Sequence, residues 1–97
     1  MKLTEYREIT AKMVGVSPDG WMPDVNEKQA RMVADILIER GYGVRELSFD
    51  FDGEVLGSFP FIVELVNIRS DNIFQGYGGT FAEAFMNAFI EYQNFEI

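Results

Sequence analysis

Three carboxylates stand close together in the middle of the chain, at Asp50, Asp52 and Glu54. Carboxylates in alternation beside a glycine are typical of calcium-binding loops, because Ca²⁺ prefers oxygen ligands. An EF-hand loop that began at Asp50 would need a glycine at its sixth position and a glutamate at its twelfth, where this chain has Val55 and Phe61. No apolar surroundings are predicted here that would favour a protonated carboxyl group, as a general acid requires. We therefore predict neither a metal site nor catalysis at these carboxylates.

A glycine-rich segment at residues 76–80 precedes a predicted helix, and free amides at a helix N-terminus can hold an anion. The segment departs from the G-x-G-x-x-G pattern because Phe81 occupies the last position, and no lysine follows it as in a P-loop. No Lys or Arg occurs from Ser70 to Ile97 to neutralise a phosphate. Two interpretations stay open: the glycines relax a strand-to-helix turn that Thr80 caps, or the segment forms a small-ligand or anion-binding module. The residues of that module would be Gly76, Tyr77, Gly78, Gly79 and Thr80.

The charge of the chain is concentrated in its second half. Residues 1–45 carry seven acidic and seven basic side chains, whereas residues 46–97 carry nine acidic side chains and one basic side chain, Arg69. The net charge of −8 therefore comes entirely from the second half. Such a surface repels nucleic acid and anionic membranes, yet it can attract a protein that normally binds phosphate backbones. We predict no direct binding of nucleic acid.

The composition excludes several classes of protein. The chain has no cysteine and no histidine, so it has no thiolate ligand or nucleophile and lacks the commonest general base. No apolar run of about 18 residues could span a bilayer, and no apolar core of a signal peptide follows the first residues. Ninety-seven residues with 47% hydrophobic side chains suffice for one core. We expect a single domain over residues 1–97 that is cytoplasmic, binds no cofactor and is not an enzyme.

Two helices are predicted in the first half, over residues 4–14 and 25–40. Apolar residues recur in both at intervals of three and four, which is the period of an amphipathic helix. Asp24 has the spacing of a capping box and should begin the second helix. The apolar surface of this helix is the wider one, so we expect it to be the most buried helix, with Leu37 at its contact with the sheet. Trp21, in the loop between the helices, should cover the core.

From Arg45 the apolar period changes to two, which predicts strands. The first strand should run to a turn at Asp52, the second should cover residues 59–66, and the third should begin at Ile73. A final helix over residues 81–92 follows a second capping box at Thr80-Phe81-Ala82-Glu83. The predicted fold class is α+β, in the order α-α-β-β-β-α, with helices packed on a three-stranded antiparallel sheet.

The final helix carries an aromatic stripe formed by Phe81, Phe85, Phe89 and Tyr92. Such a stripe at helical spacing usually belongs to the core. Three short helices and a small sheet must nevertheless cover nine Phe, four Tyr and one Trp. Part of the aromatic surface could therefore form the seam of a homodimer.

Several short segments of the chain resemble the phage ABA-sandwich domain family. They are the loop Gly-Trp-Met-Pro-Asp at residues 20–24, the helix end Glu-Arg-Gly-Tyr at residues 39–42, and a glycine and threonine leading an alanine-rich helix. The similarity covers most of Gly20 to Tyr92, and the last helix differs in being rich in Phe rather than in small aliphatic residues. The resemblance implies a small α+β protein of phage genomes with no established activity, and it assigns a role to no residue.

Charge and resemblance together lead to a functional hypothesis. The chain would be a small acidic phage- or prophage-type interaction protein that binds a bacterial host protein, as an inhibitor of a nucleic-acid-binding defence or regulatory factor. The alternatives are the ligand module at residues 76–80 and a self-associating accessory protein. The candidate partner-binding residues, which follow two strands predicted to be adjacent, are Glu46, Asp50, Asp52, Glu54 and Glu64.

Overall fold

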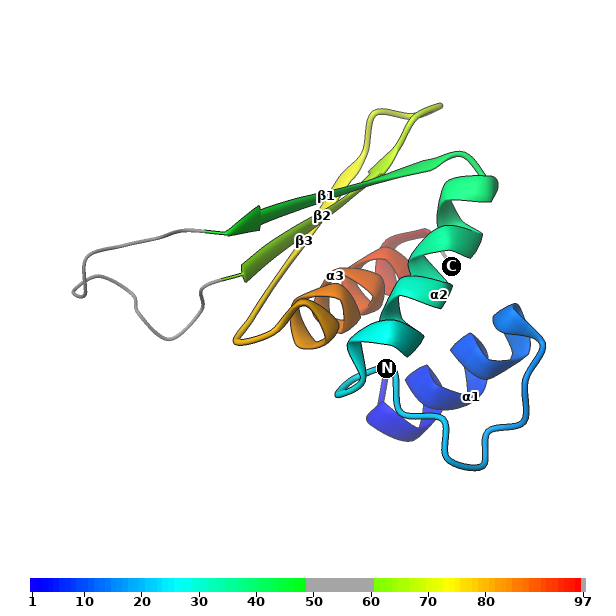
Figure 1. Cartoon of the computed structure of the whole chain (residues 1–97). Coiled ribbons are helices and arrows are strands. Elements are labelled where there is room, and N and C mark those ends of the chain that lie inside the picture. Colours follow the sequence, from blue (N-terminus) through cyan, green and yellow to red (C-terminus); the bar gives the residue numbers. More distant parts are fainter. Residues whose placement is uncertain (49–60, 97) are drawn as a thin grey trace.

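The structure is a computed structural model that describes residues 1–48 and 61–96 (Figure 1). It confirms the predicted α+β fold and the order α-α-β-β-β-α. The predicted turn at Asp52 and Gly53 lies outside the described residues. The elements are α1 (Leu3–Val14), α2 (Glu27–Glu39), β1 (Tyr42–Ser48), β2 (Phe61–Asn67), β3 (Ile73–Gly78) and α3 (Phe81–Glu96).

The three strands form one antiparallel sheet in the order β1-β2-β3. The helices lie together on one side of this sheet (Figure 1). Val63 and Leu65 of the central strand point toward the helices and are fully buried. In the part of the chain that the structure describes, no helix covers the opposite side, which we call the uncovered face.

The helix α3 packs directly on the backbone of β3. A Cβ atom at Gly76 would collide with the backbone of Ala84 and Ala88 on α3, and one at Gly78 would collide with the backbone of Ala84. These two glycines therefore belong to the strand and allow the helix to approach it. The interpretation that they relax a turn is wrong, because β3 continues to Gly78 and only Gly79 and Thr80 make the connection.

The helix most deeply buried is α3 and not α2, contrary to the sequence-based expectation. Phe85 and Phe89 are completely inaccessible to solvent, and Phe81 is nearly so. The aromatic stripe is therefore core as far as Phe89, while Tyr92 is partly buried and stacks edge-on against Phe74. The reason lies in Gly76 and Gly78, which lack Cβ atoms and so let α3 pack directly on the backbone of β3.

The helix α2 begins after Asn26, whose side chain accepts a hydrogen bond from the backbone of Gln29 at 3.0 Å. The prediction that Asp24 caps it is wrong. Asp24 instead accepts two hydrogen bonds of 2.9 Å from the guanidinium of Arg7 on α1. Leu37 is fully buried, as predicted for this helix.

The first helix packs through Tyr6, whose ring meets Phe89 edge-on at 5.3 Å. Trp21 is 5% exposed and donates a hydrogen bond from Nε1 to Thr10 Oγ1 at 2.9 Å, which confirms that it covers the core. The helix ends where Gly15 adopts a φ of 86°, a left-handed conformation that glycine accepts readily. Together these contacts hold α1 at the end of the core formed by α3.

We expect Gly76→Ala to lower the free energy of unfolding by about 1–3 kcal/mol, because the added methyl group has no space against α3. Gly79→Ala is the matched control. A Cβ there meets no atom within 4 Å, so the substitution should change stability by less than about 1 kcal/mol. Urea unfolding of both variants measures the difference, and equal losses would contradict the proposed close contact.

Asp24→Asn should remove a pH-dependent part of the stability. Hydrogen bonds from Arg7 hold the pKa of Asp24 below its usual value, so the pair stabilises the folded state above the ordinary aspartate pKa of about 3.9 and loses this effect as the pH falls further. At pH 7 the loss should be about 1–3 kcal/mol, and it should shrink toward pH 3. Urea unfolding between pH 7 and pH 3 tests this. Asp19→Asn, in the exposed loop, is the matched control, because it changes the net charge equally.

Candidate functional site

The structure separates the carboxylates that the sequence grouped as a partner-binding surface. β1 and β2 are adjacent, as predicted, but the register pairs Glu46 with Val63 and Arg45 with Glu64. Directly paired residues share a face of a sheet, and neighbours along a strand alternate. Glu46 and Glu64 therefore lie on opposite faces. The other three members of the group, Asp50, Asp52 and Glu54, lie outside the described residues.

Glu46 is engaged by the helical layer. Arg31 of α2 donates two hydrogen bonds to its carboxylate, at 2.6 and 2.8 Å. These bonds lower the pKa of Glu46 from its usual value. The same guanidinium lies 3.8 Å above the centre of the Phe81 ring. Glu46 thus links β1 to α2 through Arg31, which also packs on Phe81 of α3, so its carboxylate is already paired although it is partly exposed.

Glu64 lies in the centre of the uncovered face and is 8% exposed. Its two carboxylate oxygens accept hydrogen bonds from Gln75 Nε2 at 2.6 Å and from Arg45 Nη1 at 3.3 Å. Tyr77 in turn donates its hydroxyl to Gln75 Oε1 at 3.3 Å. A polar row therefore crosses all three strands. A carboxylate with both oxygens occupied holds its neighbours in position and offers little to a new ligand.

Apolar side chains flank this polar row on both sides. Tyr77 pairs with Ile62, which pairs with Leu47, while Ile73 pairs with Val66. Ile73 and Tyr77 are 56% and 47% exposed, although both belong to a regular strand. Exposed apolar residues grouped on one face are typical of a surface that contacts another molecule. They are concentrated on β3, at one side of the sheet.

The outer edge of β3 presents free backbone groups. The amide of Asn67 donates to the carbonyl of Asn72 at 2.8 Å, which makes these two residues a hydrogen-bonded pair at the end of the β2–β3 ladder. In an antiparallel ladder, bonded and non-bonded pairs alternate. The backbone groups of Ile73, Gln75 and Tyr77 must therefore point away from β2. The carbonyl of Tyr77 already accepts a hydrogen bond from the Asn87 side chain, at 2.7 Å.

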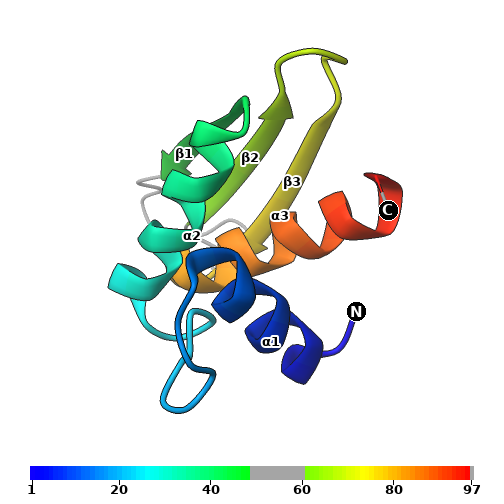
Figure 2. The same cartoon turned by 90° about the vertical axis from the view of Figure 1, so that its right-hand side faces the viewer.

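A groove runs along this edge between β3 and α3. Figure 2 shows α3 crossing beneath the sheet and extending past β3. The hollow is about 530 Å³, and an adjoining hollow of about 520 Å³ opens toward the uncovered face and includes Glu64 and Ile73. Gln75, Tyr77 and Glu91 line both hollows, so they form one continuous depression around the strand. We call the first hollow the edge groove; its residues are Gln75, Gly76, Tyr77, Asn87, Ile90 and Glu91.

The five residues of the predicted ligand module do not form one open site. Gly76 and Gly78 are buried under α3. At the helix N-terminus, Thr80 Oγ1 accepts a hydrogen bond from the amide of Glu83 at 3.2 Å, which confirms the predicted cap. The Glu83 carboxylate then accepts from the amide of Gly79 at 3.3 Å. An anion at this turn would be repelled by the Glu83 carboxylate, which already occupies the Gly79 amide that the anion would need.

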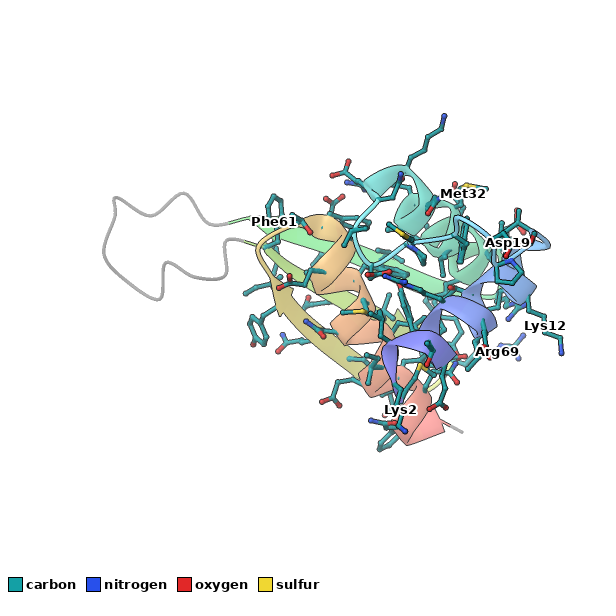
Figure 3. The ribbon with its side chains drawn as sticks, turned by 90° about the horizontal axis from the view of Figure 1, so that it is seen from below. Lys2, Lys12, Asp19, Met32, Phe61 and Arg69 are labelled. Carbon is teal, nitrogen blue, oxygen red and sulfur yellow. The ribbon has the colours of Figure 1, made fainter. Side chains whose placement is uncertain are left out.

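A further hollow of about 470 Å³ lies beside Trp21, where Asp19 and Met32 line it from the loop and from α2 (Figure 3). Its polar groups serve the fold. The Gln29 side chain, for example, accepts a hydrogen bond from the amide of Met22 at 2.7 Å. Among residues 1–48 and 61–96, no group of three or more acidic residues is placed to hold a metal ion. No helix in those ranges is long and apolar enough to cross a membrane.

Comparison with known proteins finds no match to this chain among protein-family models, curated proteins or solved structures. The resemblance to the phage ABA-sandwich domain therefore stays a prediction. The sequence alone did not single out Asn87, Ile90 and Glu91, which share a site with β3 only after α3 has folded onto it. The one feature of the sequence that pointed to this region was the absence of Lys and Arg after Arg69.

We expect inorganic phosphate to leave the amide resonances of Gly79 and Thr80 unchanged at millimolar concentration. The Glu83 carboxylate occupies the Gly79 amide and repels an anion there. Glu83→Gln removes the repulsion and serves as the comparison. Saturable shifts of these amides in the unsubstituted protein would favour the ligand module instead.

Proposed function

We propose that this chain is a protein-binding module, not an enzyme, that accepts an extended segment of a partner chain as a fourth strand beside β3. One observation carries the proposal: the backbone groups of Ile73 and Gln75 point outward along a groove. Edge strands with free amides and carbonyls are templates for pairing with another chain. The partner-binding prediction from the sequence is thereby kept, but its site moves from the acidic residues of β1 and β2 to the edge of β3.

Strand addition accounts for the shape of the depression around β3. Main-chain hydrogen bonds would supply affinity, and alternate side chains of the added segment would supply specificity. Side chains of a strand point alternately to its two faces. One set would lie over the uncovered face near Ile73 and Tyr77, and the other set would enter the edge groove near Ile90. The hollow on the uncovered face would receive the first set of side chains, and the edge groove would receive the second.

The segment must be short. Asn87 already occupies the Tyr77 carbonyl, so pairing at this end can use only the Tyr77 amide. At the other end, β3 begins at Ile73, after a turn in which Asp71 has a φ of 61°. About five residues of β3 are therefore available, which is the usual length of a strand.

The opposite edge of the sheet is a weaker candidate. α2 lies beside β1, and Arg31 forms its two hydrogen bonds with Glu46 there. A chain that added to β1 would approach this ion pair. At β3 the nearest helix is α3, which leaves the edge groove open. The residues of this groove form no ion pair within the described parts of the chain.

We expect Gln75→Pro to weaken binding of an added strand at least tenfold, because it removes an outward amide at the centre of β3. Gln75→Thr is the matched control. Both substitutions remove the hydrogen bond to Glu64, but only proline lacks the amide, so threonine should cost less than about threefold. The probes are peptides selected from a random-peptide display library on the unsubstituted protein. Calorimetry gives their affinities.

Amide chemical shifts then locate the bound peptides. Perturbations should concentrate on residues 73–77 and on residues 87–91 of α3. Circular dichroism of both variants confirms that they fold. A library that yields no binder, binders that map elsewhere, or equal effects of the two substitutions would refute strand addition at β3.

A further inference from the structure

We infer that the segment bound at β3 is basic, and that Glu91 receives one of its Lys or Arg side chains. This inference rests on the proposed strand addition and names the chemistry of the partner. Glu91 is exposed and lines both hollows around β3, so it borders the path of an added strand on the side of α3. It has no ion-pair partner among the described residues.

Among the described residues, no Lys or Arg forms an ion pair with Glu91, and Arg45 on the uncovered face is bonded to Glu64. No Lys or Arg occurs from Ser70 to Ile97, and this stretch includes all of β3 and α3. The lysines of the helical layer include Lys2 and Lys12, which lie on or next to α1 (Figure 3). The nearest preceding cation in the sequence is Arg69, in the turn before β3. A cation brought by a partner would therefore meet an unpaired carboxylate.

The other carboxylates near the depression are already engaged. Glu64 accepts hydrogen bonds from Gln75 and Arg45, and Glu83 accepts one from the Gly79 amide. Glu91 is the carboxylate of the edge groove to which the described residues offer no hydrogen bond or ion pair. Ile90 lies beside it in the groove and offers an apolar surface to the aliphatic part of a Lys or Arg side chain, whose charged end can then reach the carboxylate.

A second copy of this chain fits the same edge less well. Pairing of β3 with the β3 of a second copy would be symmetric, so each surface element would face its counterpart across a two-fold axis. Two copies of α3 would then approach along the edge, each with Glu91 and with no Lys or Arg. Like charges at short range disfavour this pairing, whereas a basic segment of a different chain is attracted.

The test uses the display-selected peptides and their synthetic variants, with each Lys or Arg replaced in turn by Gln. Selected sequences should be enriched in Lys and Arg over the unselected library. For one such position, Lys→Gln should weaken binding to the unsubstituted protein about threefold to fivefold at 50 mM salt, and the effect should largely vanish at 500 mM salt. The same replacement should have no effect on binding to Glu91→Gln.

Glu91→Lys should weaken the basic peptides at least fivefold, while Glu8→Lys, on the exposed side of α1, should change affinity less than twofold. The two variants have the same net charge, so they separate local from overall electrostatics. Peptides that map to β3 but carry no excess of Lys or Arg, or equal effects of the two variants, would overturn the basic partner and leave strand addition intact. Failure of any peptide to map to β3 would instead refute the proposed function. Sedimentation showing a dimer whose interface includes residues 73–77 would assign the edge to a second copy.

Discussion

The backbone contact between α3 and β3 determines where the other elements can lie. It exists because Gly76 and Gly78 lack the Cβ atoms that would hold the helix away, and because Ala84 and Ala88 face them. A helix at this distance brings its large aromatic residues into the centre of the core, where α1 and α2 then pack around them. The same contact places Asn87 and the residues that follow it along the outer edge of β3. One packing constraint thus builds both the core and the groove.

Much of this fold could be predicted from local pattern. The apolar residues recur at a period of about 3.6, then 2, then 3.6 again, and these changes predict the order of helices and strands. Thr80 caps α3, as the capping-box spacing indicates. The errors arose where a distant residue competes with a local signal. Asp24 and Asn26 are equally suitable caps, and Arg7, seventeen residues away, decides between them by binding Asp24. The glycines of β3 are ambiguous for the same reason, because only the approach of α3 distinguishes a packing role from a turn.

The candidate site was less predictable than the fold. Alternation along one strand indicates which side chains share a face, but the register between strands decides which residues are neighbours. A shift by one residue would have placed Glu46 beside Glu64, whereas the observed register puts them on opposite faces of the sheet, where Arg31 of α2 binds the first and Arg45 binds the second. Gln75 and Glu91 belong to different layers and meet only at an edge. What the sequence did show was the lack of cations after Arg69, which concerns composition and needs no register.

An open strand edge beside an unpaired carboxylate has two consequences that oppose each other. Free amides and carbonyls attract any extended chain, including a second copy of the same protein, and natural sheets often protect such edges with charge.

Here the net charge of −8 keeps copies apart at long range only weakly, because salt screens exposed charges beyond about 8–10 Å. Repulsion between copies must therefore come from carboxylates at the edge itself. Glu91 occupies that place, so the residue that deters pairing with an identical acidic edge is also the one that attracts a basic segment. Selectivity in this protein would then depend on the position of one carboxylate more than on the total charge.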